Sequence, residues 1–143
     1  MAYFVWADDM VVDHGPLDAD HLKLVELVNA LNTATSEGRG YEVIDHIMSD
    51  LIVYTQEHLQ REEQMMAAMK FPHLERHQAG HAHFVKSLTD LRQKYEAGSL
   101  TVPAQLSMVL RDWLSLHIRR SDREIRVFVQ KARKHNGSTP GDA

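Results

Sequence analysis

The sequence predicts an all-α protein, an up-down-up-down four-helix bundle with an N-terminal arm. Three observations support this fold class. Glycine and proline divide the 143-residue chain into four segments, each too long to be a single strand. Within each segment, apolar residues recur at alternating steps of three and four, which is the period of one helical face. The connections between segments are short, and short connections favour antiparallel neighbouring helices.

The first helix is predicted over residues 17–37 and the second over residues 41–69. The positions that keep the helical spacing are Leu17, His21, Leu24, Val28 and Leu31 in the first, and Ile44, Ile47, Leu51, Tyr54, His58, Glu62 and Met65 in the second. Each of these helices therefore has one face that can pack into the bundle.

The third helix is predicted from Leu74 to Tyr95 and the fourth over residues 103–134. The spaced positions are Leu74, His77, His81, Phe84, Leu88, Leu91 and Tyr95 in the third, and Leu106, Leu110, Trp113, His117, Ile125 and Phe128 in the fourth. Prolines near helix starts and glycines near helix ends agree with these limits.

The two ends of the chain differ in character. Residues 1–15 form an arm that is apolar enough to pack across the bundle, whereas residues 136–143 are predicted to be a disordered tail. We therefore expect one domain, residues 1–135, which is long enough to bury a core of its own.

Composition excludes several classes of protein. The chain has no cysteine, which excludes a disulfide scaffold, a cysteine zinc site, an iron–sulfur cluster and thiol catalysis. A net charge of −4 argues against general nucleic-acid binding. No basic leader precedes the arm, and no apolar stretch is long enough for a membrane span. These features predict a soluble, cytoplasmic protein.

The unusual feature is the placement of histidine. Five of the ten histidines lie on the apolar stripes of all four helices: His21, His58, His77, His81 and His117. Glu62 shares the stripe of the second helix. Burying an imidazole without a partner costs about 1–3 kcal/mol. A metal ion would satisfy all of these groups, because neutral imidazole and carboxylate are both metal ligands.

The spacing supports a metal site and raises one question. His58 and Glu62 stand four positions apart, as do His77 and His81, so each pair projects from adjacent turns of one helix. Asp122 follows His117 by five residues, which on a regular α-helix separates their directions by roughly 140°. Either Asp122 reaches in from the flank, or the helix widens there into a π-bulge.

The ligand types indicate which metal to expect. Five imidazoles and two carboxylates are too many for one zinc ion and too rich in nitrogen for calcium or magnesium. They suggest a pair of iron ions. The Glu-x-x-His motif of carboxylate-rich di-iron bundles is absent, which makes iron storage or oxidase chemistry less suitable. The other five histidines are expected in solvent: His14, His46, His73, His83 and His135.

The combined pattern resembles the hemerythrin family, and most closely the single-domain bacteriohemerythrins. The matching motifs are Asp18-Ala19-Asp20-His21, His58-Leu59-Gln60-Arg61-Glu62-Glu63, His77 to His81, and Trp113-Leu114-Ser115-Leu116-His117-Ile118 with Asp122. The resemblance implies two iron ions per chain joined by an oxo or hydroxo bridge. It assigns His77, His81 and His117 to one iron, His21 and His58 to the other, and Glu62 and Asp122 to both.

In that family O₂ binds reversibly at the iron with the open position. The resemblance therefore implies O₂ carriage, storage or delivery to an oxygen-consuming enzyme. Separately, we expect the chain to be monomeric. Leu59, Trp113, Leu114 and Ile118 neighbour the ligands and are candidates for the pocket lining, although they also suit an ordinary core. We expect no enzymatic activity beyond a weak peroxidase-like one. The alternatives are an O₂ or redox sensor, and a protein handling nitric oxide or iron for repair.

Overall fold

The computed structural model describes residues 3–39 and 41–137, and these contain helices and no strand. The elements are η1 (Asp8–Met10), α1 (Pro16–Ser36), α2 (Tyr41–Ala68), α3 (Leu74–Glu96), α4 (Val102–Leu116), η2 (His117–Ser121) and α5 (Asp122–Gly137). Here η1 is a 3₁₀ turn in the arm, and η2 is a π-helical turn that joins α4 to α5. The predicted all-α class is confirmed.

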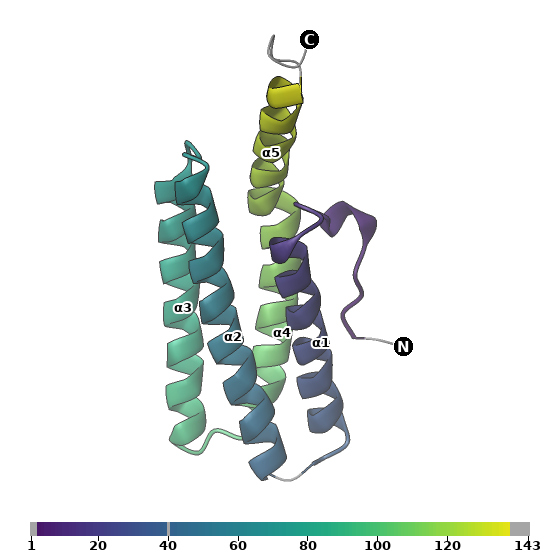
Figure 1. Ribbon diagram of the computed structural model, residues 1–143. Coiled ribbons are helices and arrows are strands. Elements are labelled where there is room, and N and C mark those ends of the chain that lie inside the picture. Colours follow the sequence, from purple (N-terminus) through teal and green to yellow (C-terminus); the bar gives the residue numbers. More distant parts are fainter. Residues whose placement is uncertain (1–2, 40, 138–143) are drawn as a thin grey trace.

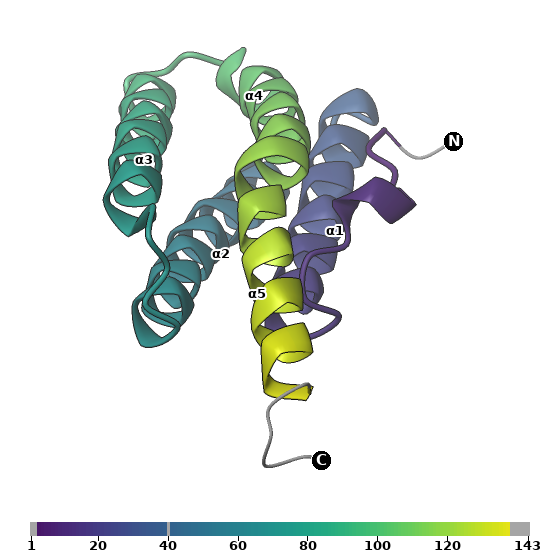
Figure 2. The ribbon, with the colours of Figure 1, turned by 90° about the horizontal axis from the view of Figure 1, so that it is seen from above.

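The four long helices pack as an antiparallel bundle. Successive helices run in opposite directions. Helix α4 continues through η2 into α5, and α5 extends beyond the loop that connects α2 to α3 (Figure 1). Helix α1 contacts α2 and α4, while α3 contacts the same two helices from the other side (Figure 2). This closed arrangement directs one stripe of every helix towards a common interior.

The predicted helix limits agree with the structure to within one or two residues for α1, α2 and α3. The single helix predicted over residues 103–134 is instead α4, η2 and α5 in succession, because a π-helical turn interrupts the α-helical hydrogen bonding. Helix α5 includes residues 136 and 137 of the predicted tail. The rest of that tail, residues 138–143, lies outside the described residues.

The arm packs along α1, as its apolar character predicts. Phe4, Met10 and Val12 are buried in the core. The side chain of Asn29 holds the arm to α1, because it accepts a hydrogen bond from the Phe4 N–H at 2.7 Å and donates one to the Phe4 carbonyl at 2.8 Å. Asp18 accepts hydrogen bonds at 2.8 Å from the N–H groups of residues 12 and 14. These contacts fix the start of α1, which carries His21.

Hydropathy along the described helices gives no membrane span, since none of them is both long enough and apolar enough to cross a bilayer.

Candidate metal centre

All seven side chains singled out by their chemistry come together inside the bundle. They come from three of the long helices and from the segment that continues the fourth: His21 from α1, His58 and Glu62 from α2, His77 and His81 from α3, and His117 and Asp122 from η2 and the start of α5. His21, His58, Glu62 and Asp122 have no exposed surface, and the most exposed, His117, retains 9%. Burial of so many ionisable groups requires compensating partners.

The π-helical turn answers the question raised by the five-residue spacing. Because η2 spans His117–Ser121, one extra residue is accommodated between His117 and Asp122. The two side chains then point to the same place, with His117 Nε2 3.0 Å from Asp122 Oδ1. Of the two explanations considered, the π-bulge is therefore correct.

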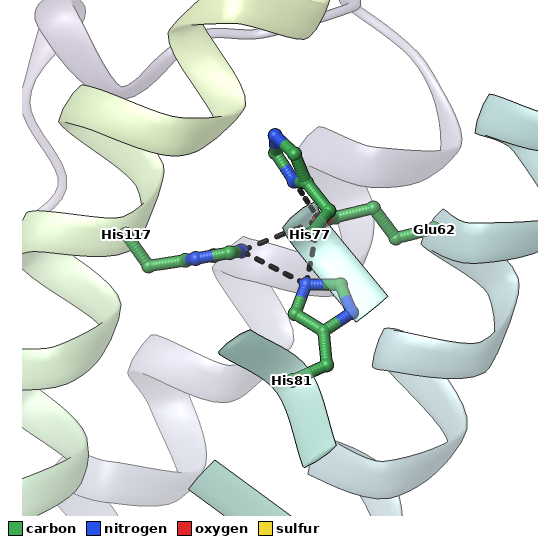
Figure 3. Close-up of side chains that lie close together, drawn as sticks. All are labelled: Glu62, His77, His81 and His117. Carbon is green, nitrogen blue, oxygen red and sulfur yellow. Dashed lines mark hydrogen bonds and ion pairs between the residues drawn. The ribbon is translucent and has the colours of Figure 1, made fainter. Parts of the chain in front are cut away.

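Glu62, His77, His81 and His117 form one cluster, in which one potential ligand atom from each lies within 4.8 Å of all the others (Figure 3). Glu62 Oε1 is 3.2 Å from Nε2 of both His81 and His117. It is 3.9 Å from Nδ1 of His77. Three imidazoles and one carboxylate oxygen thus face a common point.

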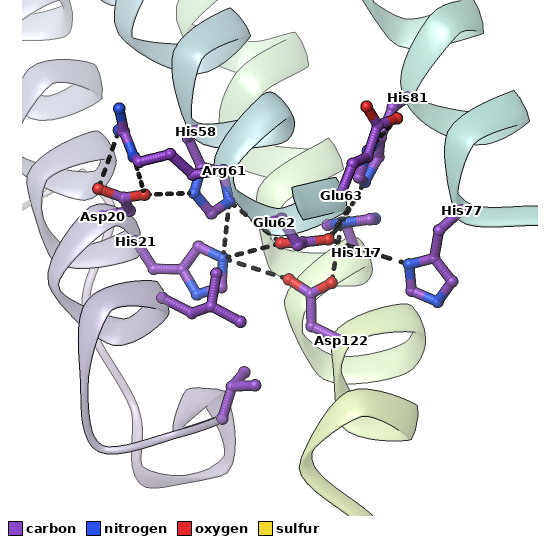
Figure 4. A network of polar contacts seen from close by, with 12 residues as sticks. Asp20, His21, His58, Arg61, Glu62, Glu63, His77, His81, His117 and Asp122 are labelled. Carbon is purple, nitrogen blue, oxygen red and sulfur yellow. Dashed lines mark hydrogen bonds and ion pairs between the residues drawn. The ribbon is translucent and has the colours of Figure 1, made fainter. Parts of the chain in front are cut away.

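His21, His58, Glu62 and Asp122 form a second cluster beside the first (Figure 4). The Nε2 atoms of His21 and His58 are 3.0 Å apart. Glu62 Oε2 lies 3.3 Å from His58 Nε2, and Asp122 Oδ2 lies 3.2 Å from His21 Nε2. Each carboxylate therefore turns one oxygen towards each cluster, which is the arrangement of a bridging ligand.

Buried polar atoms in these clusters lack hydrogen-bond partners. Among the described residues they are His21 Nδ1, Glu62 Oε2, both ring nitrogens of His77 and both oxygens of Asp122. The oxygens of Asp122 lie at ion-pair distance from His21 and His117, yet no N–H is aimed at them. Groups that are buried, electron-rich and without donors fit a bound cation.

The electrostatics of the site also favour positive charge. Burial opposes protonation of His21 and His117, but Asp122 and Glu62 outweigh it and raise the pKa of His21 to about 9 and that of His117 to about 10. Burial would likewise raise the pKa of Glu62, yet its histidine neighbours, His117 foremost, hold that pKa well below the usual range. The two clusters therefore provide nitrogen and carboxylate donors for two cations.

Comparisons with known proteins agree with this geometry. The Hemerythrin HHE cation binding domain family matches residues 15–126. The chain belongs to the hemerythrin family. Bacteriohemerythrins are among its relatives: that of Stenotrophomonas maltophilia is 30% identical over 136 residues, covering 94% of this chain and 85% of the relative. The bacteriohemerythrin of Methylococcus capsulatus is 30% identical over 124 residues, covering 86% of this chain and 94% of the relative.

In this hemerythrin-family chain, a second layer of polar residues surrounds the cluster of His21 and His58. His58 Nδ1 donates to Asp20 Oδ2 at 2.9 Å, and Asp20 also accepts from Arg61 Nε at 2.9 Å and from Tyr54 at 2.9 Å. Burial alone would raise the pKa of Asp20, but the hydrogen bonds from His58, Arg61 and Tyr54 prevail and hold that pKa well below its usual range. Asp20 is therefore a buried carboxylate, with its charge balanced by Arg61.

The cluster of His77, His81 and His117 has a similar but longer hydrogen bond, in which His81 Nδ1 donates to Glu63 Oε1 at 3.3 Å. In both cases a carboxylate lies at the outward ring nitrogen, which leaves the inward Nε2 to coordinate a cation when one is bound. Sequence reasoning missed Asp20, Tyr54, Arg61 and Glu63 as functional residues. Asp20 and Glu63 lie directly next to His21 and Glu62 in the chain, and that adjacency was the available signal.

Among the four candidate lining residues, Trp113 contacts a histidine of this centre. Leu59, Leu114 and Ile118 are buried in the core. Trp113 stacks on His117, with ring centroids 4.3 Å apart and planes 11° from parallel. Its other stacking partner is Phe84, at 3.7 Å. The stacking on Trp113 therefore holds the ring of His117 in place.

Most of the remaining histidines lie in solvent as predicted. His14, His46, His73 and His83 are exposed. The side chain of the fifth, His135, lies outside the described residues. Within the described part of the chain, position on the helical stripe therefore separated the clustered histidines from the exposed ones.

Proposed function

We propose that this protein binds O₂ reversibly at a pair of non-haem iron ions, for carriage, storage or delivery to an oxygen-consuming enzyme. One observation carries the proposal: two adjacent clusters are joined by Glu62, which belongs to both, and by Asp122, which lies 3.0 Å from His117, but they hold unequal numbers of histidines. One cluster has His77, His81 and His117, whereas the other has only His21 and His58. The ion in the cluster with fewer histidines would keep a coordination position for an external ligand.

The residues have distinct roles in this proposal. His77, His81 and His117 would hold one ion, and His21 and His58 would hold the other. Glu62 and Asp122 would bind both, since each directs one oxygen to each cluster. When bound, the iron pair would supply two electrons and an open coordination position for O₂. Membership of the hemerythrin family supports this assignment.

The chain contributes an enclosure for this chemistry. Leu59, Leu114 and Ile118 are almost completely buried, and we propose that they line the O₂ pocket together with Trp113. An apolar lining excludes water and stray protons, which would otherwise promote irreversible oxidation of the site. Asp20 orients His58 from outside the pocket through the hydrogen bond at Nδ1.

Reversibility is the property that distinguishes binding from catalysis. The iron-loaded protein would be reduced without oxygen, exposed to O₂ and then purged with argon, while its visible absorption spectrum is recorded. An absorption band that appears with O₂ and disappears on purging, over repeated cycles, is the expected result. Irreversible bleaching on the first exposure would overturn the proposal and favour a redox role. A parallel titration with nitric oxide, compared at equal concentrations, tests the repair alternative.

A further inference from the structure

We propose that a second pocket, between the α2–α3 connection and α5, binds a small anion with an apolar body, such as a medium-chain or aromatic carboxylate. This inference is independent of the proposed O₂ chemistry. The pocket has a volume of about 440 Å³. Small-molecule sites commonly have volumes of about 300–1,000 Å³. In Figure 1 the α2–α3 loop and α5 lie at the same end of the molecule.

The floor of the pocket is aromatic and apolar. Phe71 and Phe128 meet edge to face, with centroids 5.4 Å apart and planes at 89°. Phe71 is only 5% exposed, so its ring is held in place by the core. Val127 forms part of the wall, yet 40% of its surface is exposed. An apolar ligand would cover this surface and gain free energy from its removal from water.

The rim of the pocket carries mostly positive charge. Arg76, Arg123 and Lys131 line it together with a single carboxylate, Glu124. Arg76 pairs with Glu124 and so links α3 to α5 across the pocket. Arg123 and Lys131 make no ion pair with any described residue. Two cations thus remain available to a ligand.

The charge of this rim is opposite to that of the whole chain, which has a net charge of −4. A local excess of cations on an acidic protein raises the concentration of anions at that place. The cations of the rim and the aromatic floor together favour a ligand that combines one negative group with an apolar body. The volume of the pocket lies within the range of small-molecule sites, which favours a small molecule as the occupant.

The test uses 8-anilinonaphthalene-1-sulfonate, a fluorescent probe with one sulfonate and two aromatic groups. Titration of the full-length protein should give a saturable, single-site increase in fluorescence. Octanoate should displace the probe, whereas octan-1-ol at the same concentration should not. The variant Arg123→Glu/Lys131→Glu should bind the probe about tenfold or more weakly, because it loses two charge-assisted contacts.

The matched control is Lys86→Glu/Lys94→Glu, which changes the net charge equally at exposed positions of α3. It should bind like the parent. Val127→Glu provides a second variant, since it places a carboxylate in the wall while both cations remain. Circular dichroism verifies that each variant is folded.

Equal probe binding by the rim and control variants, or displacement by octan-1-ol as readily as by octanoate, would overturn the proposal. So would sedimentation showing that the parent dimerises through this face and that Arg123→Glu/Lys131→Glu remains a monomer. That result would identify a second copy of the chain as the occupant.

Discussion

Asp20 on α1 holds the imidazole of His58 on α2 through a 2.9 Å hydrogen bond to Nδ1, on the ring edge facing away from the paired clusters (Figure 4). Arg61 and Tyr54 fix the aspartate in turn, because both donate to its oxygens. A carboxylate on the outer nitrogen of a ligating histidine sets the tautomer and raises the basicity of the inner nitrogen. The affinity of the His21 and His58 cluster for metal should therefore depend on Asp20.

Replacing this carboxylate tests that dependence. Asp20→Asn retains the shape of the side chain but removes its negative charge, so the metal held by His21 and His58 should bind about 10–100-fold more weakly. Dialysis against graded chelator, followed by metal analysis, measures the loss, which should affect one ion per chain. The control is Glu57→Gln, an exposed carboxylate that also pairs with Arg61, at 3.8 Å. Equal metal retention by both variants would contradict the role assigned to Asp20.

Metal removal should destabilise the fold, because metal binding compensates for the buried ligand groups only in the folded state. A ligand present at about a thousand times its Kd stabilises by roughly 4 kcal/mol. We expect the melting temperature of the chelator-treated protein to fall by about 10 °C or more. Calorimetry of both forms provides the measurement. Coinciding melting curves would show that the clusters do not hold metal.

The stability of the metal-free protein should depend on pH in a defined direction. The pKa values of His21 and His117 rise on folding from 6.5 to about 9 and about 10, so the folded chain binds protons more tightly than the unfolded one. This stabilisation is complete below pH 6.5 and is lost as the pH rises towards 9–10. The lowered pKa of Glu62 contributes above about pH 4.5 and is lost in acid.

Metal competes with these same protons, so the two forms should diverge with pH. The difference in melting temperature between loaded and metal-free protein should widen from pH 6.5 to pH 9. Melting curves of both forms at half-unit intervals would establish the trend. A difference that stays constant across this range would argue against proton displacement from His21 and His117.

The bundle could be predicted from sequence because each helix carries its own signal. Alternating steps of three and four located α1 to α3 almost to the residue, since the period of a helix is a local property. The fourth helix was harder to interpret. A regular helix cannot align His117 with Asp122, and only the structure showed that η2 resolves the conflict with a π-helical turn.

The inner residues of the site were predictable for the same reason, whereas the outer ones were not. A histidine on an apolar stripe is anomalous in the sequence itself, which identified His21 and His58 without any knowledge of their neighbours. Asp20 and Arg61 are ordinary charged residues on two different helices. Their contact depends on how α1 and α2 are rotated against each other, and periodicity does not specify that rotation.

The unequal division of histidines provides a test of the proposed O₂ site. His21→Ala removes one of the two histidines from its cluster and leaves His77, His81 and His117 in place. Each chain should therefore retain one iron and lose the reversible O₂ band, because a single iron cannot supply both electrons. His46→Ala is the matched control, since His46 is exposed on α2 and, among the described residues, pairs only with Asp50 at 3.3 Å. It should retain both irons and cycle normally. Two irons and normal O₂ affinity in His21→Ala would reject the assignment of His21 and, with it, the location proposed for the open position.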